Sequence, residues 1–569
     1  MTTARMLRSN FEPGTTRWAI RRAQWRALGL SDADMEKPKI AVVNSSSEIS
    51  ICFSHLDAVA AEVKAAIRAA GGLPFEVRTL APSDFVHGAG RGGRYLLPSR
   101  DLLVNEIEVQ VEGPQLDGMV CLSSCDKTAP AHLMAAARLD LPTILVACGY
   151  QGCGRIGAKP VDIEDVFESV GELAEGHVTV RDIEAMCEVA VTTPGVCAGM
   201  GTANTMHAMA EALGMTLPSN APIPARGPRL AEVARAAGAR IVGMVEEDLR
   251  PRRIMTPDAF ANAIRVGLAL SGSINLLRHL QGVAEEGGIP VDVYELCDRL
   301  GPEVPLLCAV KPNGPRRIED LDAAGGVRAV MKRLEPLLAR GALTVTGRTV
   351  GETLADYEPP PGEEVLGTLE RPAALGPSIV VLRGSLAPVG AIMKLGLGGK
   401  MPAFRGAARV FESQDEALAA LARRELKPGM AVVLRGLGAR GGPGVASASW
   451  FVAAVNGAGL GEGMAVITDG QLSGLNRGYT VGQVLPEAAD GGPLALVRDG
   501  DEVAIDLAAR RLDLLVPEAE LAARRTRPAE AGPPPSAVGG GWLAQYRALV
   551  QPLDRGGVLR ARDAGAAAE

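Results

Sequence analysis

Three cysteines in polar or glycine-rich segments are the residues of this chain best suited to hold a metal. They are Cys52, Cys125 and Cys197, and they lie far apart in the sequence. A cysteine that serves only for packing usually lies in an apolar run, whereas Cys125 is followed directly by a carboxylate and an amine, Asp126 and Lys127. We interpret the three cysteines as ligands of one iron–sulfur cluster, with a second, hard cation bound beside it.

Each cysteine is a weak signal when it is considered alone. A single cysteine in a cytosolic protein is more often a small core residue than a ligand. The chain has no CxxC pair. Cys148 and Cys153 have the first spacing of a plant-type ferredoxin, but Ile156 stands where the next cysteine should be. We therefore interpret that pair as structural.

The composition excludes several classes of function. A chain of 569 residues is too long for one core, so two or three domains are expected. The net charge of −7, the isoelectric point near 5.7 and the aromatic content of 3% argue against nucleic acid or an anionic membrane as a partner. A small molecule is the expected partner.

The cysteine count and the hydropathy pattern indicate the compartment. Nine cysteines, an odd number, do not describe a disulfide framework. The first residues contain no apolar signal segment, and no apolar run reaches the roughly 18 residues of a membrane span. The reducing cytoplasm, where thiols are free to bind metal, is the expected location.

The segments around these cysteines alternate between strand and helix patterns. Short apolar runs predict strands, and apolar residues at helical spacing predict helices. The predicted strands are residues 39–44, 75–80, 117–122 and 142–147, and the predicted helices are residues 56–70 and 129–139. This order is typical of a parallel sheet covered by helices. Polar groups gather where such strands end, and Cys52, Asp84 and Cys125 each follow a predicted strand.

A proline-rich segment near residues 357–362 predicts a linker. Beyond it, short apolar runs between glycine-rich turns predict strands at residues 379–383, 431–435, 464–468, 494–497 and 503–507. A flexible stretch at 527–541 precedes a last helix at 542–550. The predicted fold class is α/β, with an N-terminal mostly parallel sheet carrying helices on both faces and a β-rich, barrel-like C-terminal domain. We place the two domains at residues 1–360 and 375–569.

Several motifs resemble those of the iron–sulfur-dependent dihydroxy-acid and sugar-acid dehydratases. The matching segments include CFSHL at 52–56, SCDKTAP at 124–130, PGVCAGMGTANTM at 194–206 and TDGQLSG at 468–474. The resemblance runs in order along nearly the whole chain and is highly specific. YLLPSR at 95–100 and MAAAR at 134–138 are closer to the dihydroxy-acid branch, whose reaction belongs to branched-chain amino acid biosynthesis.

The resemblance implies a hydro-lyase that converts a 2,3-dihydroxy acid to a 2-keto acid. It implies a [2Fe–2S] cluster held by Cys52, Cys125 and Cys197, in which one iron keeps an open position and serves as a Lewis acid. The N-terminal domain would carry this cluster, and a homodimer or homotetramer is expected.

The same resemblance implies a Mg²⁺ site and a catalytic base. Asp84 and Asp126 would bind Mg²⁺ through oxygen, and carbamylated Lys127 would be a further ligand and catalytic group. Ser473, in the C-terminal domain, matches the serine that takes the proton from C2, and it needs a nearby cation to do so. The residues expected to contact substrate are Ser273, Asn275 and Gly474.

The chain departs from the family pattern where substrate and Mg²⁺ would bind. Ser447 stands in place of a glutamate that binds Mg²⁺, and Phe85 replaces a glycine. The further replacements are Ser271, Ile274, Leu276, Ser385, Gln471 and Gln483. Losing a carboxylate should weaken Mg²⁺ binding. Either the substrate has changed, to a sugar acid or another hydroxy acid, or the chain is a catalytically impaired sensor or scaffold that carries a cluster. We favour a changed substrate, because Asp84, Asp126, Lys127 and Ser473 all remain.

A dinucleotide-binding oxidoreductase is a further alternative, since residues 88–93 formally satisfy GxGxxG. That motif should open a helix directly after a strand. Here a loop separates it from the preceding predicted strand, so the motif is weak.

Overall fold

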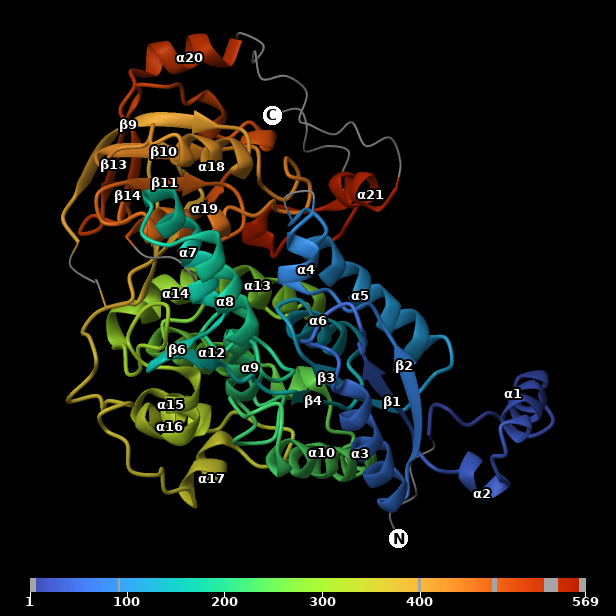
Figure 1. Ribbon diagram of the computed structural model, residues 1–569. Helices are drawn as coiled ribbons and strands as arrows, with labels where there is room; N and C mark the ends of the chain where they lie inside the picture. The colour runs from blue at the N-terminus through green and yellow to red at the C-terminus, as the bar shows by residue number, and fades with distance from the viewer. Residues whose placement is uncertain (1–6, 91–92, 398–400, 473–477, 527–540, 562–569) are drawn as a thin grey trace.

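The computed structural model describes residues 7–90, 93–397, 401–472, 478–526 and 541–561. Its N-terminal part is built on a sheet of four parallel strands in the order β2-β1-β3-β4 (Figure 1). These strands are β1 (Lys39–Asn44), β2 (Leu73–Arg78), β3 (Gly118–Ser123) and β4 (Thr143–Ala147). β1, β3 and β4 are buried along their whole length, as expected for a parallel sheet covered on both faces.

Helices cover both faces of this sheet. α3 (Leu56–Ala69) follows β1 and turns its buried residues Leu56, Val59, Val63 and Ile67 toward the core, at helical spacing. α10 (Pro228–Glu246) packs beside it. Right-handed crossovers place α3 on one face and α5 (Leu96–Glu112) and α6 (Thr128–Leu139) on the other.

The rest of the N-terminal part is mainly helical. Its longer helices are α7 (Ile163–Glu175), α8 (Val180–Val189), α9 (Thr202–Ala212), α12 (Pro257–Ala269), α13 (Asn275–Gly287), α14 (Val293–Leu300) and α16 (Gly326–Arg333). Its short helices are α2 (Asp32–Met35), α4 (Asp84–Gly88), α11 (Pro251–Ile254), α15 (Ile318–Ala323) and α17 (Val350–Ala355). β5 (Gly154–Ile156) and β6 (Lys159–Val161) form a small hairpin. α1 (Thr16–Ala27) stands out from the body together with α2 (Figure 1).

The C-terminal part is an eight-stranded mixed sheet that nearly closes into a barrel. Its strands are β7 (Ile379–Leu382), β8 (Gly390–Lys394), β9 (Phe404–Phe411), β10 (Met430–Leu434), β11 (Ala465–Thr468), β12 (Tyr479–Leu485), β13 (Glu502–Asp506) and β14 (Arg511–Leu514), in the order β14-β13-β9-β10-β11-β12-β8-β7. Backbone hydrogen bonds from Arg383 N to Arg510 O (3.0 Å) and from Leu512 N to Arg383 O (3.1 Å) join the two ends. The helices of this part are α18 (Gln414–Ala422), α19 (Ser449–Gly457), α20 (Glu518–Thr526) and α21 (Trp542–Leu549).

The two parts meet through α7 and α19, which come from opposite halves of the chain (Figure 1). Two glycines allow the close approach. A Cβ at Gly171 of α7 would clash with the carbonyl oxygen of Ala454, and one at Gly457 of α19 would clash with that of Glu168. The apolar core is therefore continuous from the parallel sheet to α19, where Phe451 and Val452 are buried.

The predicted fold class is confirmed, with local differences. The predicted strands and helices of the first 150 residues are present, displaced by at most two residues at their ends. The strand predicted at 494–497 is wrong, because Pro493–Leu496 is a short 3₁₀ helix that turns Leu494 into the barrel core. Proline at the start of this segment favours a tight helical turn. β8, β9, β12 and β14 were not predicted.

Two further expectations concern motifs and membranes. β2 ends at Arg78 and Gly88 is the last residue of α4, so the described part of the GxGxxG segment does not directly follow a strand. No helix in the described ranges is long and apolar enough to cross a membrane. The predicted flexible stretch at 527–541 lies outside the described residues, apart from Gly541.

Candidate active site

The carboxyl ends of the parallel strands bring the predicted site residues together. Cys52 follows β1, Asp84 begins α4 after β2, and Cys125 lies between β3 and α6. Cys197 precedes α9, and its loop is anchored beside the end of β4 by the hydrogen bond from Gln151 N to the carbonyl oxygen of Val196 (2.8 Å). All four loops therefore meet at one edge of the sheet, where such folds place their ligands.

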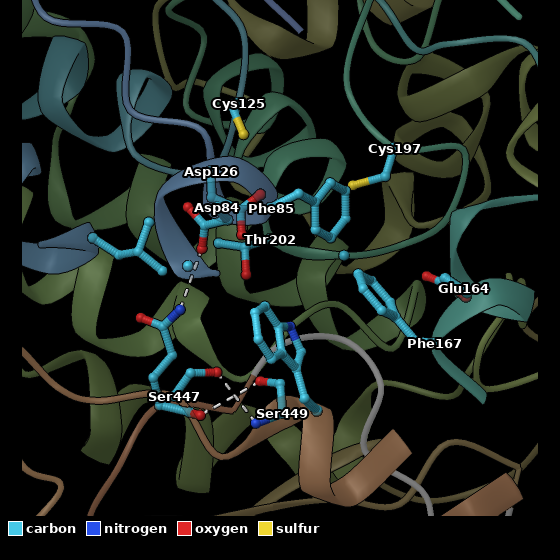
Figure 2. Close-up of a pocket in the computed structure, with 15 residues that line it drawn as sticks. Asp84, Phe85, Cys125, Asp126, Glu164, Phe167, Cys197, Thr202, Ser447 and Ser449 are labelled. Carbon is cyan, nitrogen blue, oxygen red and sulfur yellow. Dashed lines mark hydrogen bonds between the residues drawn. The ribbon is translucent and has the colours of Figure 1, made fainter. Parts of the chain in front are cut away.

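One cavity connects these loops to the C-terminal part of the chain. Asp84, Cys125 and Cys197 line it from the N-terminal side, and Ser447 and Gln471 line it from the loops before α19 and after β11 (Figure 2). The site is thus assembled from both halves of the chain.

Hydrogen bonds hold the three cysteine loops in place. The Ser124 hydroxyl donates to the carbonyl oxygen of Cys52 (2.6 Å). The Asn204 amide of α9 donates to the carbonyl oxygens of Cys197 and Gly199, both at 2.8 Å. These contacts join the Cys52 loop to the Cys125 loop and fix the Cys197 loop to α9.

The thiols of Cys52 and Cys125 are buried, hydrogen-bonded neighbours, and the half-buried Cys197 lies within electrostatic reach of Cys52. A hydrogen bond from the Cys125 thiol lowers the pKa of Cys52 to about 7, and it raises the pKa of Cys125 well above its usual value. Desolvation, followed by the neighbouring Asp126 and Cys52, raises the pKa of Cys197. The paired thiols of Cys52 and Cys125 suit a soft metal centre, because a metal replaces the thiol protons, and Cys197 would be the third ligand.

Hard ligands lie directly beside the thiols. Asp84, Cys125 and Asp126 each offer a ligand atom, and these atoms lie within 4.8 Å of one another. Burial and then Asp84 raise the pKa of Asp126 to about 7. The buried Lys127 Nζ donates to both oxygens of Asp84, at 2.9 and 2.7 Å. Two adjoining carboxylates beside the Cys125 thiol fit one hard cation next to a thiolate-bound metal.

A polar relay behind Asp84 fixes its orientation. The buried Arg278 can only donate, and its Nη2 donates to Gln471 Oε1 (2.9 Å). The Gln471 amide nitrogen therefore faces Asp84 and donates to Oδ2 (3.3 Å). Among the described residues, neither Nε nor Nη1 of Arg278 has a hydrogen-bond partner. The relay adds a positive charge behind the acidic group.

Two predicted substrate contacts lie one layer behind the cavity. Thr202 lines the cavity, and its Oγ1 lies 2.9 Å from the Ser273 hydroxyl. The Asn275 amide nitrogen also donates to Thr202 Oγ1 (2.9 Å), and Gln483 donates to Asn275 Oδ1 (3.3 Å). Ser273 and Asn275 therefore act on the cavity through Thr202 in this structure. The predicted base Ser473 and the predicted contact Gly474 lie outside the described residues.

The position where the family pattern has glutamate also faces the cavity. Ser447 Oγ accepts a hydrogen bond from the backbone N–H of Ser449 (3.3 Å). Its backbone pairs with Gln471. A short hydroxyl thus replaces a carboxylate at the cavity wall.

Sequence reasoning missed several further cavity residues, among them Glu164, Phe167, Thr202 and Trp450. Thr202 lies inside a quoted motif and could have been found there. Phe167 and Trp450 lie in α7 and α19, and nothing local in the sequence indicates that these helices meet. The only sequence signal for these two residues is that aromatic side chains are rare, at 3% of the chain.

Comparisons with known proteins match both parts of the chain. A family model described as dihydroxy-acid/6-phosphogluconate dehydratase, N-terminal, matches residues 37–353, and its C-terminal counterpart matches residues 364–557. A protein of Methanothrix thermoacetophila named dihydroxy-acid dehydratase is 42% identical over 558 residues, which cover 97% of this chain and 100% of that protein. Proteins of the same name from Ignicoccus hospitalis (42% identical) and Pyrococcus abyssi (39% identical) each cover 95% of this chain, at 98% of their own length.

Proposed function

Because this chain belongs to the dihydroxy-acid/6-phosphogluconate dehydratase family, we propose that it is a hydro-lyase that removes water from a 2,3-dihydroxy carboxylic acid to give a 2-keto acid. One observation carries the proposal. The thiols of Cys125 and Cys197 and the carboxylates of Asp84 and Asp126 open onto the same cavity.

The proposed cofactors are a [2Fe–2S] cluster and Mg²⁺. Cys52, Cys125 and Cys197 would hold the cluster, and Asp84 and Asp126 would hold Mg²⁺. Bound there, the two supply Lewis acidity, which favours loss of the 3-hydroxyl group and makes the C2 proton more acidic. Three cysteine ligands for a two-iron cluster leave one coordination position for substrate.

The chain's own residues orient the reactants. Lys127 and Gln471 hold the Asp84 carboxylate from two sides, so its position is fixed before substrate binds. Carbamylation of Lys127 would convert its nitrogen donor into an additional oxygen ligand. Thr202 presents a hydroxyl at the cavity wall, supported from behind by Ser273 and Asn275.

Ser473 is the proposed base. It would take the proton from C2 while the hydroxyl group leaves C3, so the net change is loss of one water and formation of an enol. The enol then tautomerises to the 2-keto acid. A cation close to the serine oxygen is required, because an unassisted hydroxyl is far too weak an acid to act this way.

A substrate panel tests the proposed function. The protein is purified without oxygen, its cluster is reconstituted and Mg²⁺ is added, and 2-keto acid release is measured by hydrazone formation. We expect one 2-keto acid for each dihydroxy acid consumed, without NAD⁺ reduction. A protein that carries the cluster but turns over no member of the panel would support the sensor or scaffold alternative instead. NAD⁺ reduction with the same panel would support a dehydrogenase.

A further inference from the structure

Three aromatic rings form one wall of the active-site cavity. Phe85 and Phe167 (Figure 2) line it together with Trp450. All three side chains are only half-buried. The ring centroids of Phe85 and Phe167 are 5.1 Å apart, and those of Phe167 and Trp450 are 6.5 Å apart with the ring planes 24° from parallel. We name this group the aromatic wall.

The aromatic wall is held in place by the elements that carry it. Phe85 follows Asp84 directly in α4, Phe167 lies on α7, and Trp450 lies near the start of α19. The glycine contacts between α7 and α19 fix the distance between Phe167 and Trp450. The side-chain oxygen of Gln414 accepts the backbone N–H of Trp450 (3.0 Å), which anchors the start of α19.

The aromatic wall lies next to the reacting centre. Figure 2 shows the Phe85 ring between Asp84 and Cys197. Leu96 extends the apolar surface, since a Cβ added at Gly88 would lie 3.6 Å from Leu96 Cδ1 and 3.8 Å from Trp450 Cζ2. A substrate whose carboxylate and hydroxyls face the Asp84 and cysteine side therefore directs its C3 substituent toward the rings.

The chemistry of this wall discriminates between substituents. Ring faces and edges pack well against another planar ring, and such pairs add attraction beyond simple area burial. A polyhydroxylated chain packed against the rings would lose hydrogen bonds to water, because ring carbons offer no replacement partners. A phosphate needs cationic partners, and the described lining of the cavity contains no Lys or Arg side chain.

We propose that the aromatic wall selects a 2,3-dihydroxy acid whose C3 carries an aryl group. This inference rests on the proposed function. Small branched alkyl acids and phosphorylated sugar acids are then poor substrates. Phe85, Phe167 and Trp450 are the specificity-determining residues, and Glu164 also lines the cavity.

The test compares kcat/KM for 2,3-dihydroxy-3-phenylpropanoate, 2,3-dihydroxy-3-methylbutanoate and 6-phosphogluconate. We expect the phenyl acid to be preferred over each of the others by about tenfold or more. We next compare kcat/KM for 2,3-dihydroxy-3-phenylpropanoate with kcat/KM for 2,3-dihydroxy-3-methylbutanoate. Phe167→Leu and Trp450→Leu should each lower this ratio several-fold, mainly by raising KM for the phenyl acid. Phe404→Leu, which breaks a ring pair with Tyr479 in the barrel, should leave this ratio unchanged.

The outcomes separate the two proposals. If 2,3-dihydroxy-3-methylbutanoate or 6-phosphogluconate is preferred over the phenyl acid, the aryl inference is overturned. The proposed dehydratase function is then unaffected. If no acid is turned over, the proposed function fails, and calorimetric binding then decides the inference on its own. Tighter binding of phenylpyruvate than of 2-oxo-3-methylbutanoate, reduced in Phe167→Leu, would support the aromatic wall, and equal binding would refute it.

Discussion

At the residue scale, the site combines soft and hard donors within a few ångströms. Cys125 contacts Cys52 on one side and lies beside Asp84 and Asp126 on the other. Lys127 then balances part of the negative charge of Asp84. We therefore propose that the segment from Cys125 to Lys127 supplies both soft and hard ligands to the site.

The most informative single position at this scale is Ser447. Ser447→Glu places a carboxylate on the cavity wall. The backbone of residue 447 pairs with that of Gln471, whose side chain contacts Asp84. An additional charged oxygen ligand should tighten binding of Mg²⁺, or of Mn²⁺ as its probe, by about tenfold. Electron paramagnetic resonance of free Mn²⁺ measures this directly.

The control is Ser447→Gln, which has nearly the same size without the charge. It should bind Mn²⁺ no more tightly than the unchanged protein. Equal Mn²⁺ affinity in the Glu and Gln variants would show that Ser447 does not face the cation site.

At the element scale, the contact between α7 and α19 positions the aromatic wall. Gly171→Ala would push the two helices apart, because the added methyl group clashes with the backbone of Ala454 and Ala458. Overpacking against backbone costs about 1–3 kcal/mol of unfolding free energy. Chemical denaturation measures this loss, and we also expect weaker binding of aryl acids.

Gly243→Ala is the matched control for that substitution. Gly243 also lies within a helix, α10, but its added Cβ would meet only the flexible side chains of Arg240 and Glu247. Alanine there should be neutral or stabilising by up to about 1 kcal/mol. Equal effects of the two substitutions would contradict the close helix contact.

The elements themselves were predictable to different degrees. β1 and α3 follow from a clear apolar run and a clear helical period. β9 has the alternation of a half-buried strand, but its inward positions include the small Gly406 and Ala408, which hide the pattern. The meeting of Phe167 with Trp450 could not be predicted, because it depends on two glycines nearly 300 residues apart making backbone contact.

At the scale of the whole molecule, buried carboxylates make stability depend on pH. Glu211 of α9 accepts the backbone N–H groups of Ser219 and Ala221, both at 2.7 Å, and burial raises its pKa from 4.5 to about 7. The folded state therefore holds this proton more tightly than the unfolded state does. As the pH rises from about 4.5 to 7, the unfolded state loses the proton first and the free energy of unfolding falls.

Glu211→Gln should remove this part of the pH dependence. The unchanged protein should lose about 3 kcal/mol from this group between pH 4.5 and pH 7, a window that follows from its raised pKa. The variant should be less stable at low pH, where it loses hydrogen bonds to Ser219 or Ala221, and should show a shallower decline. Urea unfolding at a series of pH values measures both, and an unchanged slope would contradict the assignment.

The whole molecule also shows why the site needs both halves of the chain. The cysteines and acidic residues come from the parallel sheet, whereas Ser447, Trp450 and Gln471 come from the loops and helix next to the barrel. The motifs predicted the first set by residue type and position at strand ends. They could not predict that Ser273 and Asn275 contact the cavity lining through Thr202, because that depends on how α9 and α13 pack.

The central claim is that three distant cysteines form one metal centre. Its most direct measurement is the iron and acid-labile sulfide content of protein reconstituted without oxygen, for the unchanged chain, Cys125→Ser and the control Cys153→Ser. We expect two irons and two sulfides per chain in the unchanged protein and in Cys153→Ser. Cys125→Ser should lose them, because serine oxygen replaces thiolate poorly at such clusters. A full cluster in Cys125→Ser, or its loss only in Cys153→Ser, would show that Cys125 is not a ligand of a cluster shared by the three cysteines.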